Sequence, residues 1–304
     1  SIAFVFLTAF ILHSQQKEPP TLDPSFHKER RQMVLEQLPP NSISVIFSAP
    51  IRNRANDVDH PYHQNPNFYY LTGFKEPHAI LLIYKELQDI DGEQINEVLF
   101  VQERDPLREQ WDGYRLGVEG AKKRLGFKQV LFNTDFATYN TQFDQFDSVL
   151  FFEFENDVRD DASAVADLYS LIEAFKTKAN YPQDFYAKRT SLYRYITTSD
   201  AKSSANVSQI LDRSLRYDDK LAKDPLLVEY KKAINERQRT ELKQQMQSQL
   251  SNLDTETLGG IMDELREVKH PEEVELLKKA IYISAVGQVE VMKTMHPNMS
   301  EREI

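Results

Sequence analysis

Cysteine is absent from this chain of 304 residues. Its absence excludes a disulfide framework, a thiolate metal site and a thiol nucleophile. Glycine is scarce, with nine residues, and no glycine-rich phosphate loop occurs. No serine carries the nucleophile-elbow pattern of serine hydrolases. Any chemistry of this chain must therefore use oxygen or imidazole groups.

A basic stripe is also missing. The formal net charge is −10, and lysine and arginine do not cluster along the chain. Sequence-independent binding to phosphate backbones needs such clusters, so nucleic acid is not an expected partner. Hydrophobic residues make up 40% of the chain, including 18 Phe and 14 Tyr, which is typical of a globular protein. The length suits one large or two ordinary domains.

The first residues form the longest apolar run. Ile2 to Leu12 has the length of a signal-peptide core and is shorter than the about 20 residues that a membrane-spanning helix needs. A small-residue cleavage pattern at Leu12 and Ser14 would leave Gln15 as the mature N-terminus. Residues 1–14 are therefore predicted to be a signal-peptide remnant, with export to the periplasm or the extracellular space and no stable membrane span. The alternative is a buried element of the fold, which would favour a cytoplasmic protein.

Residues 22 to about 154 alternate between helix-like and strand-like segments. Asp23 and Pro24 predict a helix start that runs to about Leu38, and Gly126 predicts a C-cap for residues 119–125. The β-prone runs are Ser44–Ala49, Ala79–Tyr84, Val98–Gln102, Val130–Phe132 and Val149–Phe154. This alternation predicts an α/β sheet covered on its faces by helices.

The composition changes at about Asp160. Residues 162–179, 200–215 and 224–250 have amphipathic or charged helical patterns, and β-prone runs disappear. We expect a helical elaboration over about 160–260. For residues 224–250, a solvated helical face or hairpin is the favoured interpretation, and a partner-binding helix is the alternative.

The last forty residues predict a helix boundary. Pro271 lacks an amide hydrogen and Glu272 and Glu273 favour the positive end of the helix dipole, so a helix of about 20 residues should begin there. Ser300 and Glu303 have capping-box spacing and predict another helix start. We expect the protein to continue beyond Ile304, because the sequence stops inside that helix nucleus.

One cluster has the residue types of a metal site. Asp57, Asp59, His60 and His63 lie within seven residues and could ligate zinc or manganese. Pro61 favours an extended His60, however, and residues 60 and 63 then point to opposite faces. A polar loop at a sheet edge or subunit contact is the favoured interpretation.

Three motifs in order resemble the aminopeptidase P family. They are HPYHQNPNFYYLTGFKEPHAILLIY from His60 to Tyr84, ERDPLREQWDGYRLGVEGA from Glu103 to Ala121 and LREVKHPEEVELLKKA from Leu265 to Ala280. The resemblance implies a mixed sheet flanked by helices, like the N-terminal domain of creatinase and aminopeptidase P. It places that domain at 22–262, and at 263–304 the first helix of a truncated pita-bread catalytic domain. Within the first motif, Phe68, Tyr69 and Tyr70 suit a half-buried strand and Gly73 suits a turn.

The resemblance also implies a function for the parent protein. Family members are Xaa-Pro aminopeptidases that release the residue preceding proline, using two Mn²⁺ ions bound by two Asp, one His and two Glu. All five ligands would lie beyond Ile304, so no metal ligand or catalytic residue is assigned here and this chain alone is expected to be inactive. Proline-containing peptides would be the substrates.

Two residues acquire an expected role from the family's dimers or tetramers. An Asp and a Trp of one front domain approach a neighbouring subunit's active site, and the matching positions are Asp57 and Trp111. His63 departs from the family, which usually has Arg there. A prolidase-like dipeptidase and a non-enzymatic binding or assembly module remain as alternatives.

Overall fold

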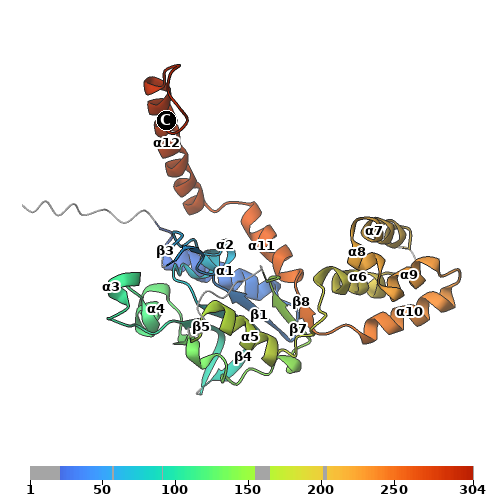
Figure 1. Ribbon diagram of the computed structural model, residues 1–304. Coiled ribbons are helices and arrows are strands. Elements are labelled where there is room, and N and C mark those ends of the chain that lie inside the picture. Colours follow the sequence, from blue (N-terminus) through green and yellow to red (C-terminus); the bar gives the residue numbers. More distant parts are fainter. Residues whose placement is uncertain (1–20, 57, 91, 155–164, 201–203, 304) are drawn as a thin grey trace, which may run out of the picture. The chain divides into compact units, whose positions relative to one another are not determined.

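The computed structural model describes residues 21–56, 58–90, 92–154, 165–200 and 204–303 (Figure 1). It divides into two compact units, one formed by Pro24–Val268 and a second one that contains residues 269–303. The predicted signal-peptide remnant, residues 1–14, and the predicted site residue Asp57 lie outside the described residues.

The larger unit is built on a six-stranded mixed sheet. Its strands are β1 (Ser42–Phe47), β4 (Ile80–Ile90), β5 (Glu93–Val101), β6 (Gln129–Phe132), β7 (Ser148–Phe151) and β8 (Leu253–Asp254), in the order β6-β5-β4-β1-β7-β8. The pairs β1–β4 and β4–β5 are antiparallel, and β5–β6, β1–β7 and β7–β8 are parallel. The five predicted strands and the mixed α/β class are confirmed.

Helices cover both faces of this sheet, as the alternation of side chains along the strands requires. Val45, Leu82 and Phe100 point to one face and share a core with Phe175 of α5 (Leu168–Lys178). The helices α1 (Pro24–Gln37) and α11 (Thr257–Glu267) pack against β4 and β7, respectively, and against each other. The predicted helix at Pro24 is therefore confirmed as part of the layer structure.

A buried arginine joins α1 to the sheet. The Arg31 Nε atom donates to the Glu97 Oε2 atom of β5 at 2.6 Å, and Nη1 donates to the Leu71 carbonyl at 2.8 Å. The guanidinium carbon also stands 3.8 Å from the ring centroid of Phe127. Because the side chain is only 1% exposed, these contacts replace water for a permanently charged group.

The segment Phe68–Tyr70 corrects a sequence prediction. It belongs to the helix α2 (Pro66–Thr72), and the predicted half-buried strand is wrong. Asn65 caps this helix by accepting from the amides of Asn67 and Phe68, and Gly73 ends it at φ 70°. The cap, the proline at the first position and the C-terminal glycine outweigh the strand propensity of the aromatic run.

Residues 187–248 form a helical extension with its own core. Its helices are α6 (Ala187–Thr198), α7 (Ser204–Tyr217), α8 (Asp219–Ala222), α9 (Pro225–Lys232) and α10 (Glu236–Ser248). Helices occupy the described residues of the range expected to be helical, and the helical pattern over 224–250 is two contacting helices, α9 and α10, which fits the hairpin interpretation. Asn235 begins the second one, because its side chain accepts from the amide of Gln238.

The second unit contains the helix α12 (Pro271–Thr294), which begins at the predicted residue. Glu273 Oε2 accepts the His270 amide at 2.9 Å. The apolar side chains Leu277, Ile281 and Met292 of α12 are exposed by 47%, 66% and 65%. Ser300 contacts Glu303 Oε2 through its amide and its hydroxyl, but residues 301–303 form a turn and not a described helix. Among the described helices, none is long and apolar enough to cross a membrane.

Candidate functional site

An exposed loop after β5 presents Trp111. This loop, residues 103–117 and hereafter the Trp111 loop, contains the short helix α3 (Glu109–Asp112) and ends where α4 (Gly117–Leu125) begins. The Trp111 side chain is 89% exposed, and Leu107 and Tyr114 are exposed by 76% and 60%. Three large apolar side chains in one loop are more than scattered surface residues, and such groups mark interaction surfaces.

The Trp111 loop is held together by its own polar contacts. Arg104 makes a two-pronged ion pair with Glu109, with Nε to Oε1 at 3.0 Å and Nη2 to Oε2 at 2.8 Å. The same guanidinium lies 4.6 Å from the ring centroid of Tyr114. Asp105 Oδ1 accepts the amides of Leu107 and Arg108 and so shapes the turn before α3. The planar fork of arginine binds both carboxylate oxygens of Glu109, and this pair links the start of the loop to α3.

A glycine allows the two ends of the loop to approach closely. Gly117 has φ 59°, and a Cβ atom at this position would stand 2.7 Å from the Arg104 Cγ atom. Only glycine meets both demands without strain. Close packing against Arg104 therefore explains why glycine occupies position 117 in the RLG sequence.

The loop lies against residues 62–78, hereafter the anchor segment. Within this segment, the Gln64 side chain makes several hydrogen bonds. Its Nε2 atom donates to the carbonyls of Glu76 at 2.9 Å and Phe74 at 3.3 Å. Its Oε1 atom accepts the amides of Ala49 and Asn65, both at 2.8 Å. One side chain thus fixes the end of β1, the start of α2 and the turn before β4.

Glu76 connects the anchor segment to the Trp111 loop. Its Oε1 atom accepts the Leu116 amide at 2.8 Å. Its Oε2 atom is buried and has no hydrogen-bond partner among the described residues. Burial raises the pKa of this carboxyl above its ordinary value, although the Leu116 amide and the charge of Arg115 oppose the shift.

His78 fixes the other end of the turn in an unusual conformation. Its φ is 57°, and its Nδ1 atom accepts the Leu168 amide at the start of α5 at 3.0 Å. Its carbonyl accepts from Asn133 Nδ2 at 2.9 Å. Burial lowers the pKa of His78 to about 4, so the imidazole is neutral at pH 7.

The cluster at residues 57–63 is not assembled into a site by the described residues. The short strands β2 (Asn53–Ala55) and β3 (Val58–Asp59) pair on either side of Asp57, and His60 and His63 are exposed. In the described parts of the chain, no three His, Asp or Glu side chains are grouped as metal ligands would be. Asp57 itself lies outside those parts, so its expected role stays a prediction.

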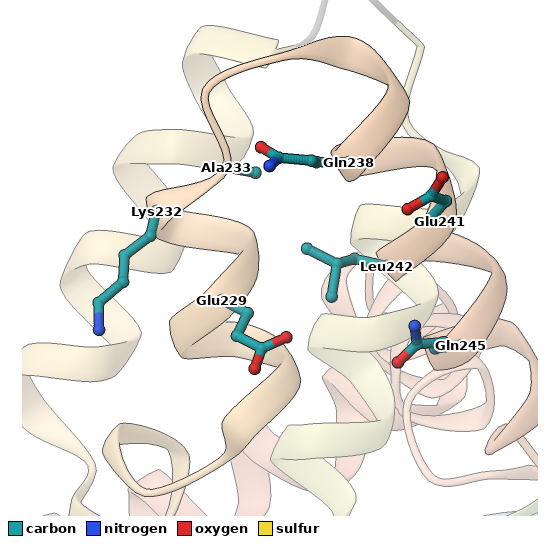
Figure 2. Close-up of a pocket in the computed structure, with 7 residues that line it drawn as sticks. All are labelled: Glu229, Lys232, Ala233, Gln238, Glu241, Leu242 and Gln245. Atoms are coloured by element: carbon teal, nitrogen blue, oxygen red, sulfur yellow. The ribbon is translucent and has the colours of Figure 1, made fainter.

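A pocket lies in the helical extension, between α9 and α10 (Figure 2). It is lined by Glu229, Lys232, Ala233, Gln238, Glu241, Leu242 and Gln245. None of these residues belongs to the anchor segment or the Trp111 loop. Figure 2 shows the Glu229 and Glu241 carboxylates on the two different helices, with Lys232 directed away from both.

Sequence reasoning named Trp111 and missed the residues that hold it. Gln64, Glu76, Arg104 and Glu109 all lie in the quoted motifs, but the motifs gave them no individual role. A charged residue between Phe74 and Pro77, next to a buried strand, was the available signal for Glu76. Its partner Leu116 is forty residues away, and no local pattern identifies such a pair.

The anchor segment and the Trp111 loop both lie in the region of the chain that matches a known protein family. Residues 27–152 match the family model described as "Aminopeptidase P, N-terminal domain". An Xaa-Pro aminopeptidase of Haemophilus influenzae is 27% identical over 278 residues, which cover 91% of this chain and 44% of that protein. Xaa-Pro aminopeptidase of Escherichia coli is 41% identical over 34% of this chain and 23% of its own length. Human Xaa-Pro aminopeptidase 3 is 45% identical over 28% and 17%, respectively.

Among solved structures, E. coli aminopeptidase P with the inhibitor Pro-Leu aligns at a TM-score of 0.42 and 25% identity, over 65% of this chain and 44% of that chain. The chain spans less than half the length of these relatives. The H. influenzae match is long enough to include most of residues 160–260. The resemblance inferred from the three motifs is confirmed.

Proposed function

We infer, from the aminopeptidase P N-terminal domain that residues 27–152 form, that this chain is the front portion of an Xaa-Pro aminopeptidase. The parent would hydrolyse the bond between an N-terminal residue and a following proline. Support comes from relatives that carry this activity in their names and from a domain in which the predicted substrate-proximal tryptophan is fully presented to solvent.

The front domain would shape the substrate cleft and the subunit contacts. An indole that is 89% exposed contributes little to the stability of its own subunit. A role for the indole follows if a neighbouring subunit of a dimer or tetramer covers it next to a bound proline peptide. Asp57 would favour the positively charged α-amino group of that peptide.

The hydrolytic chemistry would come from two Mn²⁺ ions held by residues beyond Ile304. Such ions activate a water molecule for attack on the peptide carbonyl. The described residues supply no ligand group for them. The helix α12 would open the catalytic domain, where its exposed Leu277, Ile281 and Met292 would be buried.

An activity assay tests this proposal. The 304-residue chain, purified with Mn²⁺ and given the peptide Arg-Pro-Pro, should release no arginine, whereas the longer parent protein should release it. Turnover by the 304-residue chain would overturn the placement of the metal ligands. A parent that cleaves only dipeptides would favour the prolidase-like alternative.

Export is a separate part of the proposal, resting on the apolar run Ile2 to Leu12. N-terminal sequencing of the protein from the source cells tests it. A chain that begins at Gln15 in the exported fraction is the expected result. An intact apolar run in the cytoplasmic fraction would contradict it.

A further inference from the structure

The orientation of Trp111 depends on how the ends of its loop are attached. The Arg104–Glu109 pair and the close approach of Gly117 to Arg104 connect the start, the middle and the end of the loop. With its parts connected in this way, the loop depends on its attachment points for the place of the indole. At the incoming end, Gln102 Nε2 donates to the Pro77 carbonyl at 3.2 Å.

At the outgoing end, the attachment is the Leu116 amide. Leu116 precedes α4 and has no side chain that can cap this helix. The Glu76 carboxylate accepts its amide at 2.8 Å from the neighbouring anchor segment. A carboxylate at this place satisfies a donor at the helix start and favours the positive end of the dipole.

Glu76 is itself held firmly. Gln64 binds its carbonyl at 2.9 Å, and Pro77 follows it in the chain. The backbone of Glu76 is therefore fixed by the anchor segment, and its carboxylate reaches the loop from that position. The hydrogen bond transmits the position of the sheet to the Trp111 loop.

The chemistry of Glu76 is a poor choice for stability alone. Its Oε2 atom is buried without a hydrogen-bond partner among the described residues. Leaving a buried carboxylate oxygen unsatisfied costs free energy, which a smaller or apolar residue would avoid. A carboxylate that is half satisfied in a buried place and connects to an exposed loop fits a functional constraint.

We propose that Glu76 is the positioning residue of the Trp111 loop, and that its hydrogen bond to the Leu116 amide sets where Trp111 is presented. The consequence for catalysis rests on the proposed function, in which Trp111 borders a substrate cleft. The consequence for the loop itself does not.

Time-resolved fluorescence anisotropy tests the proposal on the 304-residue chain. Trp111 is the only tryptophan of this chain, so the decay reports the motion of this loop. Glu76→Ala should shift the held loop toward a mobile form roughly fivefold, as expected for one lost hydrogen bond. Glu76→Gln keeps an acceptor oxygen and should retain a decay close to that of the wild type. An unchanged decay in Glu76→Ala would overturn the proposal.

Glu86→Ala is the matched control. Glu86 Oε1 accepts the Asn41 amide at 3.0 Å, which is the same kind of long-range contact at another place on the sheet. Its loss should leave the Trp111 decay unchanged. A similar gain of mobility in both variants would mean general loosening and would also overturn the proposal.

Leu116→Pro removes the same hydrogen bond from the donor side. Leu116 already has φ −66°, which proline adopts. This variant should mobilise Trp111 as Glu76→Ala does, and it decides the matter if Glu76→Ala does not fold by circular dichroism. A folded Leu116→Pro chain with the wild-type decay would overturn the proposal.

Kinetics of the longer parent separate this proposal from the proposed function. With Arg-Pro-Pro, Glu76→Ala and Trp111→Ala should lower kcat/KM, and the double variant should lose little more than Trp111→Ala alone. Fully additive losses would contradict a role through Trp111. A parent without any turnover refutes the proposed function and leaves the anisotropy result to judge Glu76.

Discussion

The imidazole of His27 lies against the backbone of Gly73, so that a Cβ atom on residue 73 would stand 2.7 Å from the His27 Cδ2 atom. His27 cannot easily move away, because its Nδ1 atom donates to the Tyr70 carbonyl at 2.9 Å. The glycine of the TGF turn is therefore required for close approach of α1 to α2 as well as for its φ of 70°.

Gly73→Ala should consequently destabilise the chain more than a conformational penalty alone. The left-handed backbone costs an alanine roughly 1–2 kcal/mol, and overpacking against His27 should add about 1–3 kcal/mol. Gly126→Ala is the control, because Gly126 has φ 72° and a Cβ atom on it would meet nothing within 4 Å. Urea unfolding of both variants measures the difference. Equal losses would contradict the contact with His27.

His78 should make stability fall in mild acid. Its pKa is about 4 when folded, below the ordinary value of 6.5, so the unfolded chain binds the proton first. The stabilising contribution is present above pH 6.5 and is lost as the pH falls toward 4, by roughly 3 kcal/mol at most.

The variant His78→Asn tests this dependence. Asparagine tolerates the φ of 57° and offers an oxygen to the Leu168 amide, but it does not titrate. Urea unfolding between pH 7.5 and 4.5 should show a smaller loss for this variant than for the wild type. Parallel pH profiles would remove His78 as the cause.

Glu76 should change the pH dependence of stability in the opposite direction to His78. Its pKa is raised by burial, so the folded state is favoured when the carboxyl is protonated, and this contribution is lost as the pH rises through the raised value. The stability of Glu76→Gln relative to the wild type should therefore increase from acid to neutral pH. A constant difference across that range would show that the carboxyl is not desolvated as described.

Arg31 should be among the least replaceable polar side chains of the larger unit. Arg31→Ala leaves Glu97 without its buried partner and the Leu71 carbonyl without its donor, which should cost about 3–5 kcal/mol. Arg237→Ala is the control, because Arg237 pairs with Glu241 on an exposed helix face. Thermal unfolding should separate the two variants clearly, and similar losses would contradict a buried network at Arg31.

Asn65 tests the corrected secondary structure. Asn65→Ala removes the cap of α2 and should cost about 1 kcal/mol, whereas Asn65→Asp keeps an acceptor and should cost much less. Urea unfolding measures both. An equal loss in the two variants would argue that the cap does not hold this helix.

Sequence reasoning located the sheet well because its strands are continuous apolar runs between turns. Ile80 to Tyr84 and Val98 to Val101 are apolar at every position, which is typical of the buried strands of an α/β fold. The strand β8 was missed because two residues, Leu253 and Asp254, carry no periodicity. It pairs with the edge of β7, and Asn252 beside it donates to the carbonyls of Phe143 and Phe146.

The sequence predicted Trp111, the exposed residue of the candidate site, but not the residues that hold its loop in place. Trp111 was reached through a family motif, whereas Gln64 and Glu76 act through contacts to Ala49 and Leu116 that are distant in sequence. The error at Phe68 had a different origin. Strand propensity was given more weight there than the Asn65 cap, although both signals were present.

The pairing of β7 with β8 bears on how this domain can vary. Val149 stands opposite Leu253, so the chain between them returns to the sheet one strand spacing, about 4.8 Å, from where it left. Because the two ends of this connecting segment are adjacent, a change in its length costs little loop-closure entropy and moves no other strand. The family match ends at residue 152, where this connecting segment begins. Residues 187–248 are therefore the natural place for insertions, deletions and grafted reporter domains.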